Sequence, residues 1–78
     1  MSSFDDYRRL SSLKAGTRAT VRGVLGGELR AARLATLGIT HGSRVLVLET
    51  FPGVVFMCDE TEVAVEPAVA KAILVEPD

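Results

Sequence analysis

The fold of this chain is decided by Arg33-Leu34-Ala35-Thr36-Leu37-Gly38-Ile39-Thr40-His41-Gly42. The first half of this stretch continues a helical pattern, and Gly38 predicts the helix end because glycine adopts a positive φ at the C′ position without steric cost. The second half predicts a tight turn at Thr40-His41-Gly42. A Val- and Leu-rich strand follows from Ser43 to Thr50. The stretch therefore sets a helix directly before a strand in the middle of the chain.

The length of 78 residues permits a single domain. Hydrophobic residues make up 47% of the chain, which is enough for a small core of Val, Leu, Ile and Ala. Cys58 is the one cysteine, so an internal disulfide is impossible and a reducing compartment is expected. The N-terminal residues have early acids and no apolar run, which excludes a secretory signal, and no stretch is long enough for a membrane span. We therefore expect a soluble cytoplasmic protein.

Alternating and β-branched residues predict about five short strands. In the first, Ala19, Val21, Gly23 and Leu25 should face one side, and Arg18, Thr20, Arg22 and Val24 the other. The expected strands span residues 17–25, 43–50, 54–58, 61–65 and 73–75.

Helical segments are expected at three further places. Residues 28–37 form the one clear helix, with Glu28 in its first turn and the side chains of Ala31, Leu34 and Leu37 facing the core. Single helical turns are expected near Leu10–Gly16 and from Glu66 to Ala72. At the N-terminus, the spacing of Phe4, Tyr7 and Leu10 is compatible with a short helix or with a frayed tail.

Together these segments predict a mainly β fold. The chain should form a small, strongly bent antiparallel barrel with one helix between its first two strands and a helical turn before its last strand. A flat sheet of five strands would leave its edges unpaired. The barrel domain is expected to span residues 10–78, after an N-terminal extension of residues 1–9.

Several short motifs, in their order and spacing, resemble the FeoA family (ferrous iron transport protein A). The resemblance covers residues 10–75 and rests on five pieces of sequence. They are Leu10-x-x-Leu13-x-x-Gly16, Gly26-Gly27, Arg33-Leu34-x-x-Leu37-Gly38-Ile39-x-x-Gly42, Val63-Ala64-Val65 and Ala70-x-x-Ile73-x-Val75. The chain departs from the family pattern at His41, where proline is usual, and at Asp59-Glu60, where a glycine is common. The loop around Phe51-Pro52-Gly53 is also shorter than usual.

The resemblance implies an SH3-like barrel of bacterial iron uptake. Proteins of this family are cytosolic accessories of FeoB, a membrane transporter of ferrous iron with a cytosolic GTP-binding domain. Related barrels form the C-terminal domain of DtxR-like metal-dependent repressors. In both settings the barrel is an interaction module, so we expect a FeoB-type transporter as partner, with a regulatory interaction domain of the repressor kind as the alternative.

The residue inventory argues against an enzyme, a cofactor or a metal site. No nucleophile, base and orienting group occur together, and no phosphate-binding glycine motif is present. His41 and Cys58 are far apart in the sequence, and a stable metal site needs about four ligands. We expect His41 to be an exposed turn residue and Cys58 to behave as a small hydrophobic side chain.

Charge does not favour nucleic acid as a partner. Residues 1–48 hold eight basic and three acidic residues, whereas residues 49–78 hold one basic and seven acidic residues. In a compact barrel these halves should interleave into a mixed surface. Arg18, Arg22, Arg30, Arg33 and Arg44 would have to converge to bind a nucleic acid, but the net charge is −1 and aromatic residues are few.

Binding to a protein partner is the function that the residues favour. The segment Phe51-Pro52-Gly53-Val54-Val55-Phe56 predicts a hairpin tip with aromatic residues, which would suggest an interface if they are exposed. Equally, Phe51 and Phe56 could fill the barrel. Arg30 and Arg33 lie at i and i+3 of the helix and could contact a GTPase domain or simply be solvated. The candidate contact residues are Arg30, Arg33, Phe51, Pro52, Val54 and Phe56; weak self-association stays open.

Overall fold

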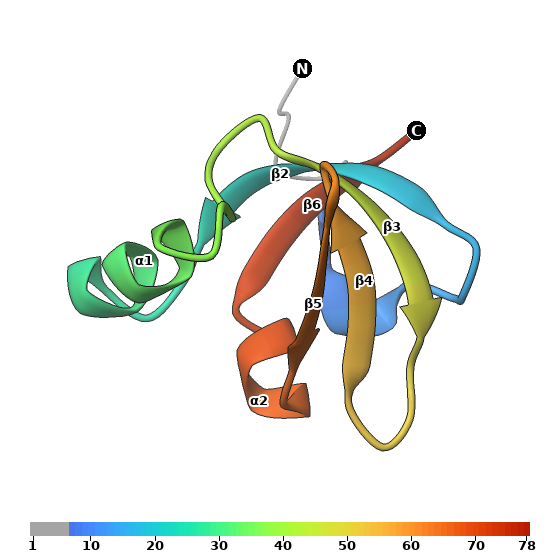
Figure 1. Ribbon diagram of the computed structural model, residues 1–78. Helices are drawn as coiled ribbons and strands as arrows, with labels where there is room; N and C mark the ends of the chain where they lie inside the picture. The colour runs from blue at the N-terminus through green and yellow to red at the C-terminus, as the bar shows by residue number, and fades with distance from the viewer. Residues whose placement is uncertain (1–6) are drawn as a thin grey trace.

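The computed structural model describes residues 7–78 and shows a mainly β fold with one strongly bent sheet (Figure 1). Six antiparallel strands lie in the order β1-β6-β2-β3-β4-β5. The strands are β1 (Arg8–Arg9), β2 (Arg18–Val24), β3 (Arg44–Glu49), β4 (Val54–Cys58), β5 (Thr61–Val65) and β6 (Ile73–Pro77). The helices are α1 (Glu28–Ala35) and α2 (Pro67–Ala70), and a 3₁₀ turn covers Leu10–Ser12.

All five predicted strands and the helices predicted at residues 28–37 and 66–72 are present, within two residues of their expected bounds, and the helical turn expected near Leu10–Gly16 is the shorter 3₁₀ turn at Leu10–Ser12. The structure adds β1, because Arg8 pairs with Val75 and Arg9 with Leu74 of β6. The expected helix or frayed tail at the N-terminus lies largely outside the described residues, and Arg8–Arg9 is a strand. Within residues 7–78 the sheet is not closed by hydrogen bonds, and β1 and β5 form its two edges.

The core fills the concave side of the bent sheet. Phe56 is its one aromatic residue and is fully buried, and the smaller aliphatic side chains of every strand except β1 surround it. The buried cluster contains Leu10, Leu13, Ala19, Val21, Leu34, Ile39, Val45, Val47, Val54, Phe56, Cys58, Val63, Ala70, Ile73 and Val75. Among residues 7–78, no helix is both long enough and apolar enough to cross a bilayer.

The expected alternation along β2 holds only for its first half. Ala19 and Val21 are buried, but the pairing of β2 with β6 shifts register between Val21 and Gly23. Such an irregularity changes which side of the sheet the following residues face. Val24 therefore packs against the core and Leu25 is 42% exposed, the reverse of the prediction for these two residues.

Helix α1 contributes less to the core than its pattern suggested. Leu34 is its one buried residue, Ala31 is half-buried, and Leu37 is 49% exposed, contrary to prediction. The helix ends at Ala35, and Gly38 has the expected positive φ of 84°. Ile39 donates its backbone N–H to the Leu34 carbonyl and buries its own side chain. Ile39 thus fills the inward position that Leu37 was expected to fill.

Two turns of the sheet have specific backbone requirements. Gly53 has no positive φ; a Cβ atom there would lie 2.8 Å from the Val65 carbonyl oxygen, so glycine is required by a close approach of two strands. The Phe51–Pro52 peptide bond is cis. In the β4–β5 turn Asp59 takes the left-handed conformation, with a φ of 54°. Aspartate tolerates this region better than most residues, which explains how the turn forms without glycine.

Candidate functional site

A pair of glycines positions helix α1 and one of its arginines. Gly26 and Gly27 connect β2 to α1 with φ angles of 100° and 91°, which favour glycine. The side chain of Arg30 lies against Gly26, and a Cβ atom there would be 3.0 Å from the Cδ and Nη1 atoms of Arg30. The absent side chain of Gly26 therefore leaves the space in which the Arg30 guanidinium rests.

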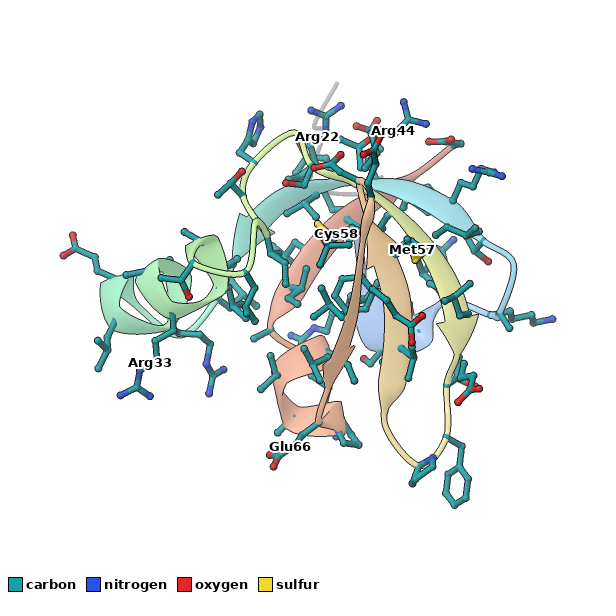
Figure 2. All side chains as sticks on the ribbon, in the orientation of Figure 1. Arg22, Arg33, Arg44, Met57, Cys58 and Glu66 are labelled. Atoms are coloured by element: carbon teal, nitrogen blue, oxygen red, sulfur yellow. The ribbon has the colours of Figure 1, made fainter. Side chains whose placement is uncertain are left out.

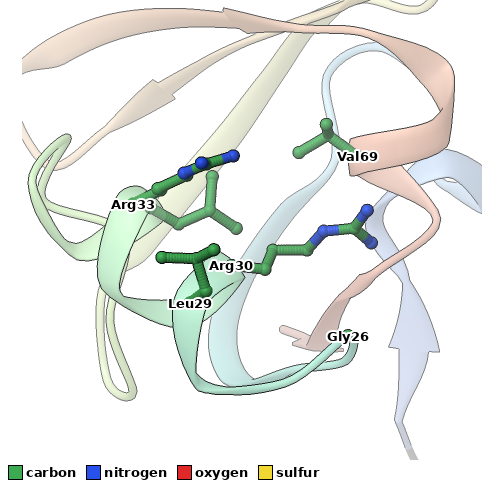
Figure 3. A pocket seen from close by; sticks show the side chains of 6 residues that line it. Gly26, Leu29, Arg30, Arg33 and Val69 are labelled. Atoms are coloured by element: carbon green, nitrogen blue, oxygen red, sulfur yellow. The ribbon is translucent and has the colours of Figure 1, made fainter.

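The exposed face of α1 borders a hollow of about 350 Å³, which we term the arginine pocket (Figure 3). Leu29 is 66% exposed at its rim, whereas Leu34 closes its base from the core. Val69 of α2 forms the opposite wall, so residues far apart in the sequence meet here. The lining residues are Gly26, Leu29, Arg30, Arg33, Leu34 and Val69.

Among the described residues, the two arginines of this pocket are not ion-paired, unlike Arg22 and Arg44 but like exposed Arg18. Arg22 forms an ion pair of 2.8 Å with Glu76, and Arg44 forms one of 2.8 Å with Asp78. Arg30 and Arg33 have no ion pair or hydrogen bond from their side chains within residues 7–78. Two unpaired guanidinium groups beside an exposed leucine suit an acidic surface that also carries an apolar side chain.

The β3–β4 turn offers a second exposed group. Phe51 is 85% exposed and Pro52 is also exposed, so the inward alternative for Phe51 is wrong. Val54 and Phe56 are 3% and 0% exposed, because alternate residues of β4 face the core. These two side chains cannot reach a partner and are removed from the predicted contact set.

The predicted contact residues do not form one continuous surface. Figure 1 shows α1 on one side of the molecule and the β3–β4 turn at its opposite lower end. The five arginines weighed for nucleic-acid binding do not converge either. Arg22 and Arg44 are paired, and Figure 2 shows them at the top of the sheet, away from Arg33 on α1. The structure therefore presents a cationic pocket and a separate aromatic tip.

Cys58 and His41 lie in different environments. His41 is exposed in its turn, as expected. Cys58 is buried, and its Sγ atom lies 3.5 Å from the Gly38 carbonyl oxygen (Figure 2). Burial raises the pKa of the Cys58 thiol, nearby Asp59 raises this pKa further, and a hydrogen bond with Ser43 opposes both effects. A protonated, buried thiol is a poor nucleophile and a poor metal ligand.

The described part of the chain contains no set of side chains arranged as metal ligands. Among residues 7–78, no three His, Cys, Asp or Glu side chains group closely enough to hold a metal ion.

Sequence reasoning found Arg30 and Arg33 but missed the pocket that joins them to Gly26, Leu29 and Val69. One signal was available, because Leu29 lies off the apolar stripe of α1 and an exposed leucine beside two arginines is unusual for a solvated face. The contribution of Val69 depends on how α2 packs near α1, which local sequence does not specify.

Comparison with known families decides the identity of the domain. The family model of the FeoA domain matches residues 8–77, nearly the whole chain. The chain belongs to the FeoA family. The resemblance seen in the motifs is thereby confirmed, and FeoA domains are small and transport-associated rather than members of an enzyme class. No curated protein matched the chain.

Solved FeoA structures share its fold. FeoA from Chlorobium tepidum is 30% identical, with a TM-score of 0.82, and the match covers 90% of this chain and 70% of that one. An iron uptake regulatory protein (FeoA) is 24% identical, with a TM-score of 0.86 and coverage of 92% and 97%. FeoA from Stenotrophomonas maltophilia, complexed with zinc and described as a prokaryotic SH3 domain protein, is 27% identical, with a TM-score of 0.74 and coverage of 86% and 87%. The SH3-like fold is thus confirmed.

The same fold occurs in metal-dependent repressors. A manganese-dependent transcriptional repressor is 26% identical to this FeoA domain, with a TM-score of 0.82. The match covers 92% of this chain but only 42% of the repressor. The likeness therefore concerns one part of a larger protein.

Proposed function

We propose that this FeoA domain is a non-enzymatic, cytosolic accessory of ferrous iron uptake that binds the cytosolic GTPase domain of a FeoB-type transporter. The observation that supports it is the arginine pocket, where Arg30 and Arg33 lie unpaired beside exposed Leu29. Family membership supports the setting of ferrous iron transport. The description of the Stenotrophomonas maltophilia FeoA protein suggests a ferrous iron transport activating factor.

The chemistry of the pocket defines the kind of surface that it would bind. A carboxylate of the GTPase domain would accept hydrogen bonds from one or both guanidinium groups, and an apolar side chain would cover Leu29. Arginine is enriched among the residues that dominate interface energies, because its planar group pairs bidentately with carboxylates. Phe51, which is 85% exposed, is a second, separate contact candidate.

A pull-down against the GTPase domain of a FeoB-type transporter from the same genome tests this function. Arg33→Ala and Arg30→Ala should each weaken binding by about 1–2 kcal/mol, because each removes a cation from the pocket. Arg18→Ala is the matched control, since Arg18 is exposed on β2, outside the pocket, and should bind as the unchanged chain does. Circular dichroism checks that each variant is folded.

Phe51→Ala tests the aromatic tip in the same assay. Reduced capture would add the β3–β4 turn to the interface, and unchanged capture would remove it. If Arg30→Ala, Arg33→Ala and Phe51→Ala all bind as the unchanged chain does, neither surface contacts the GTPase domain. Failure of the unchanged chain to bind would reject the proposed partner.

A second candidate is a free-standing regulatory interaction domain, favoured by the likeness to the manganese-dependent repressor. In that case capture should occur with a metal-dependent repressor of the same genome rather than with the transporter. A nucleic-acid partner is the third alternative, and it would give oligonucleotide binding that falls steeply with salt. Lack of oligonucleotide binding at low salt would exclude it.

A further inference from the structure

Strand β5, Thr61–Val65, is an edge of the sheet with only β4 beside it in the described part of the chain. The two strands are joined by the two-residue turn Asp59-Glu60, across which Cys58 is paired with Thr61. A strand edge with free N–H and C=O groups is a template for a further strand. The question is which backbone groups of β5 are free.

The register answers this question. A two-residue hairpin closes on a hydrogen-bonded pair, and such pairs alternate along an antiparallel ladder. Thr61, Val63 and Val65 therefore direct their backbone groups toward β4. Glu62 and Ala64 direct theirs toward the open side, and neither residue has a backbone hydrogen bond to another segment of residues 7–78.

A hollow of about 540 Å³ lies along this open edge. One wall consists of residues 61–64, and the other is the turn after α1, Thr36-Leu37-Gly38. Leu37, 49% exposed, presents apolar surface to the hollow although it was expected in the core. An added strand would thus find backbone partners on β5 and an apolar contact at Leu37.

The charged side chains beside the open edge of β5 indicate which kind of strand would bind there. Glu60, Glu62 and Glu66 are all exposed, and their side chains form no ion pair within residues 7–78. Glu62 alternates with exposed Ala64, whose small side chain leaves space beside it. Opposite charges across neighbouring strands stabilise pairing, whereas like charges oppose it.

We propose that the open edge of β5 binds an extended, basic segment of a partner protein by strand addition. The added strand pairs with the backbone of Glu62 and Ala64, places a Lys or Arg side chain beside Glu62, and packs an apolar side chain against Leu37. A second copy of this chain is a poor occupant, because pairing two β5 edges would bring the glutamates of both copies together. This surface does not include the arginine pocket, so the proposal is independent of the proposed function.

Two short peptides test the proposal with the isotope-labelled full chain in solution. The probe is an acetylated and amidated peptide of alternating lysine and valine, and the control peptide replaces each lysine with glutamate. The lysine peptide at millimolar concentration should shift the backbone amide resonances of Glu62, Ala64 and Leu37. The glutamate peptide should leave these three resonances unchanged.

Two variants of β5 separate the backbone contribution from the charge. Ala64→Pro removes an N–H from the open edge but none from the β4 ladder, so it should weaken binding about tenfold. Glu62→Lys keeps the backbone and should reverse the preference, so that the glutamate peptide binds and the lysine peptide binds about fivefold more weakly. Glu62→Lys keeps the test valid if Ala64→Pro does not fold.

Three results would overturn the proposal. These are no shifts with millimolar lysine peptide, shifts confined to other parts of the chain, and equal binding of both peptides to the unchanged protein. Amide shifts at β5 that depend on protein concentration without peptide would show self-pairing instead, and would also overturn it.

Discussion

Ser43 shows what a single polar residue does in this small barrel. Its side chain is buried, and its Oγ atom donates to the Gly38 carbonyl at 2.8 Å and accepts the backbone N–H of Thr40 at 3.0 Å. The Cys58 thiol donates to the same carbonyl at 3.5 Å. The turn from α1 to β3 is therefore closed by hydrogen bonds to a side chain.

Ser43→Ala should lower the free energy of unfolding by about 1–3 kcal/mol, because it removes two part-buried hydrogen bonds, from the Thr40 N–H and to the Gly38 carbonyl. Urea unfolding followed by circular dichroism measures the change. Ser12→Ala is the matched control, since the Ser12 hydroxyl donates to the Arg9 carbonyl at an exposed position. Equal effects of the two substitutions would contradict a structural role for Ser43.

At the scale of elements, strand contacts explain what helix and turn propensities alone do not. Gly53 lies at the start of β4, where the backbone of β5 passes so closely that a Cβ atom would meet the Val65 carbonyl oxygen at 2.8 Å. A left-handed turn, the ordinary reason for a glycine after a proline, does not explain this glycine, because its φ is not positive. The position of Val65 relative to Gly53 comes from the pairing of distant residues, which local pattern does not reveal.

Gly53→Ala should destabilise the domain by about 1–3 kcal/mol, because the new methyl group meets backbone that cannot rotate away. Gly23→Ala is the control, since its Cβ atom would have no neighbour within 4 Å and its φ is not positive. Thermal unfolding of the two variants compares them. A Gly53→Ala domain as stable as the Gly23→Ala domain would refute the close-approach explanation.

The difference between local sequence pattern and contacts among distant residues decides how much of the structure the sequence could predict. Alternation in β4 and β5 and the stop at Gly38 are local, so their elements were predicted within two residues. The sides that Val24 and Leu25 face depend on the register shift against β6, and these sides were predicted wrongly. The burial of Leu37 was also predicted wrongly, because Ile39 fills the inward position. For the site, Arg30 and Arg33 were found from their spacing, whereas the walls of the pocket depend on tertiary packing.

For the molecule as a whole, ion pairs join the basic first part of the sequence to its acidic last part. Arg22 of the basic half contacts Glu76 of the acidic half, and Arg44 contacts Asp78. The order of the sheet explains the first contact, since β6 lies beside β2, and β2 also has β3 on its other side, so that the residue after β6 comes near Arg44. The halves thus interleave as expected, while Arg30 and Arg33 on one surface and the β5 glutamates on another stay unpaired.

Salt should therefore affect binding much more than stability. Both ion pairs are at least partly exposed, with side chains 31–61% accessible, so raising the NaCl concentration should change the free energy of unfolding by less than about 1 kcal/mol. Capture of a GTPase domain through the arginine pocket should fall clearly over the same range, because it depends on charges that are free before binding. Calorimetry and the pull-down, run in the same buffers, measure the two. A domain that loses several kcal/mol in salt would contradict this assignment of the charges.

The place of β6 in the sheet has a consequence for biosynthesis. This strand lies between β1 and β2, the two earliest strands described, although its own residues, 73–77, are nearly the last of the chain. A ribosome makes the early strands first and their common neighbour last. The nascent chain therefore cannot complete this sheet until β6 has left the exit tunnel, and the edge of β2 that β6 covers stays unpaired until then.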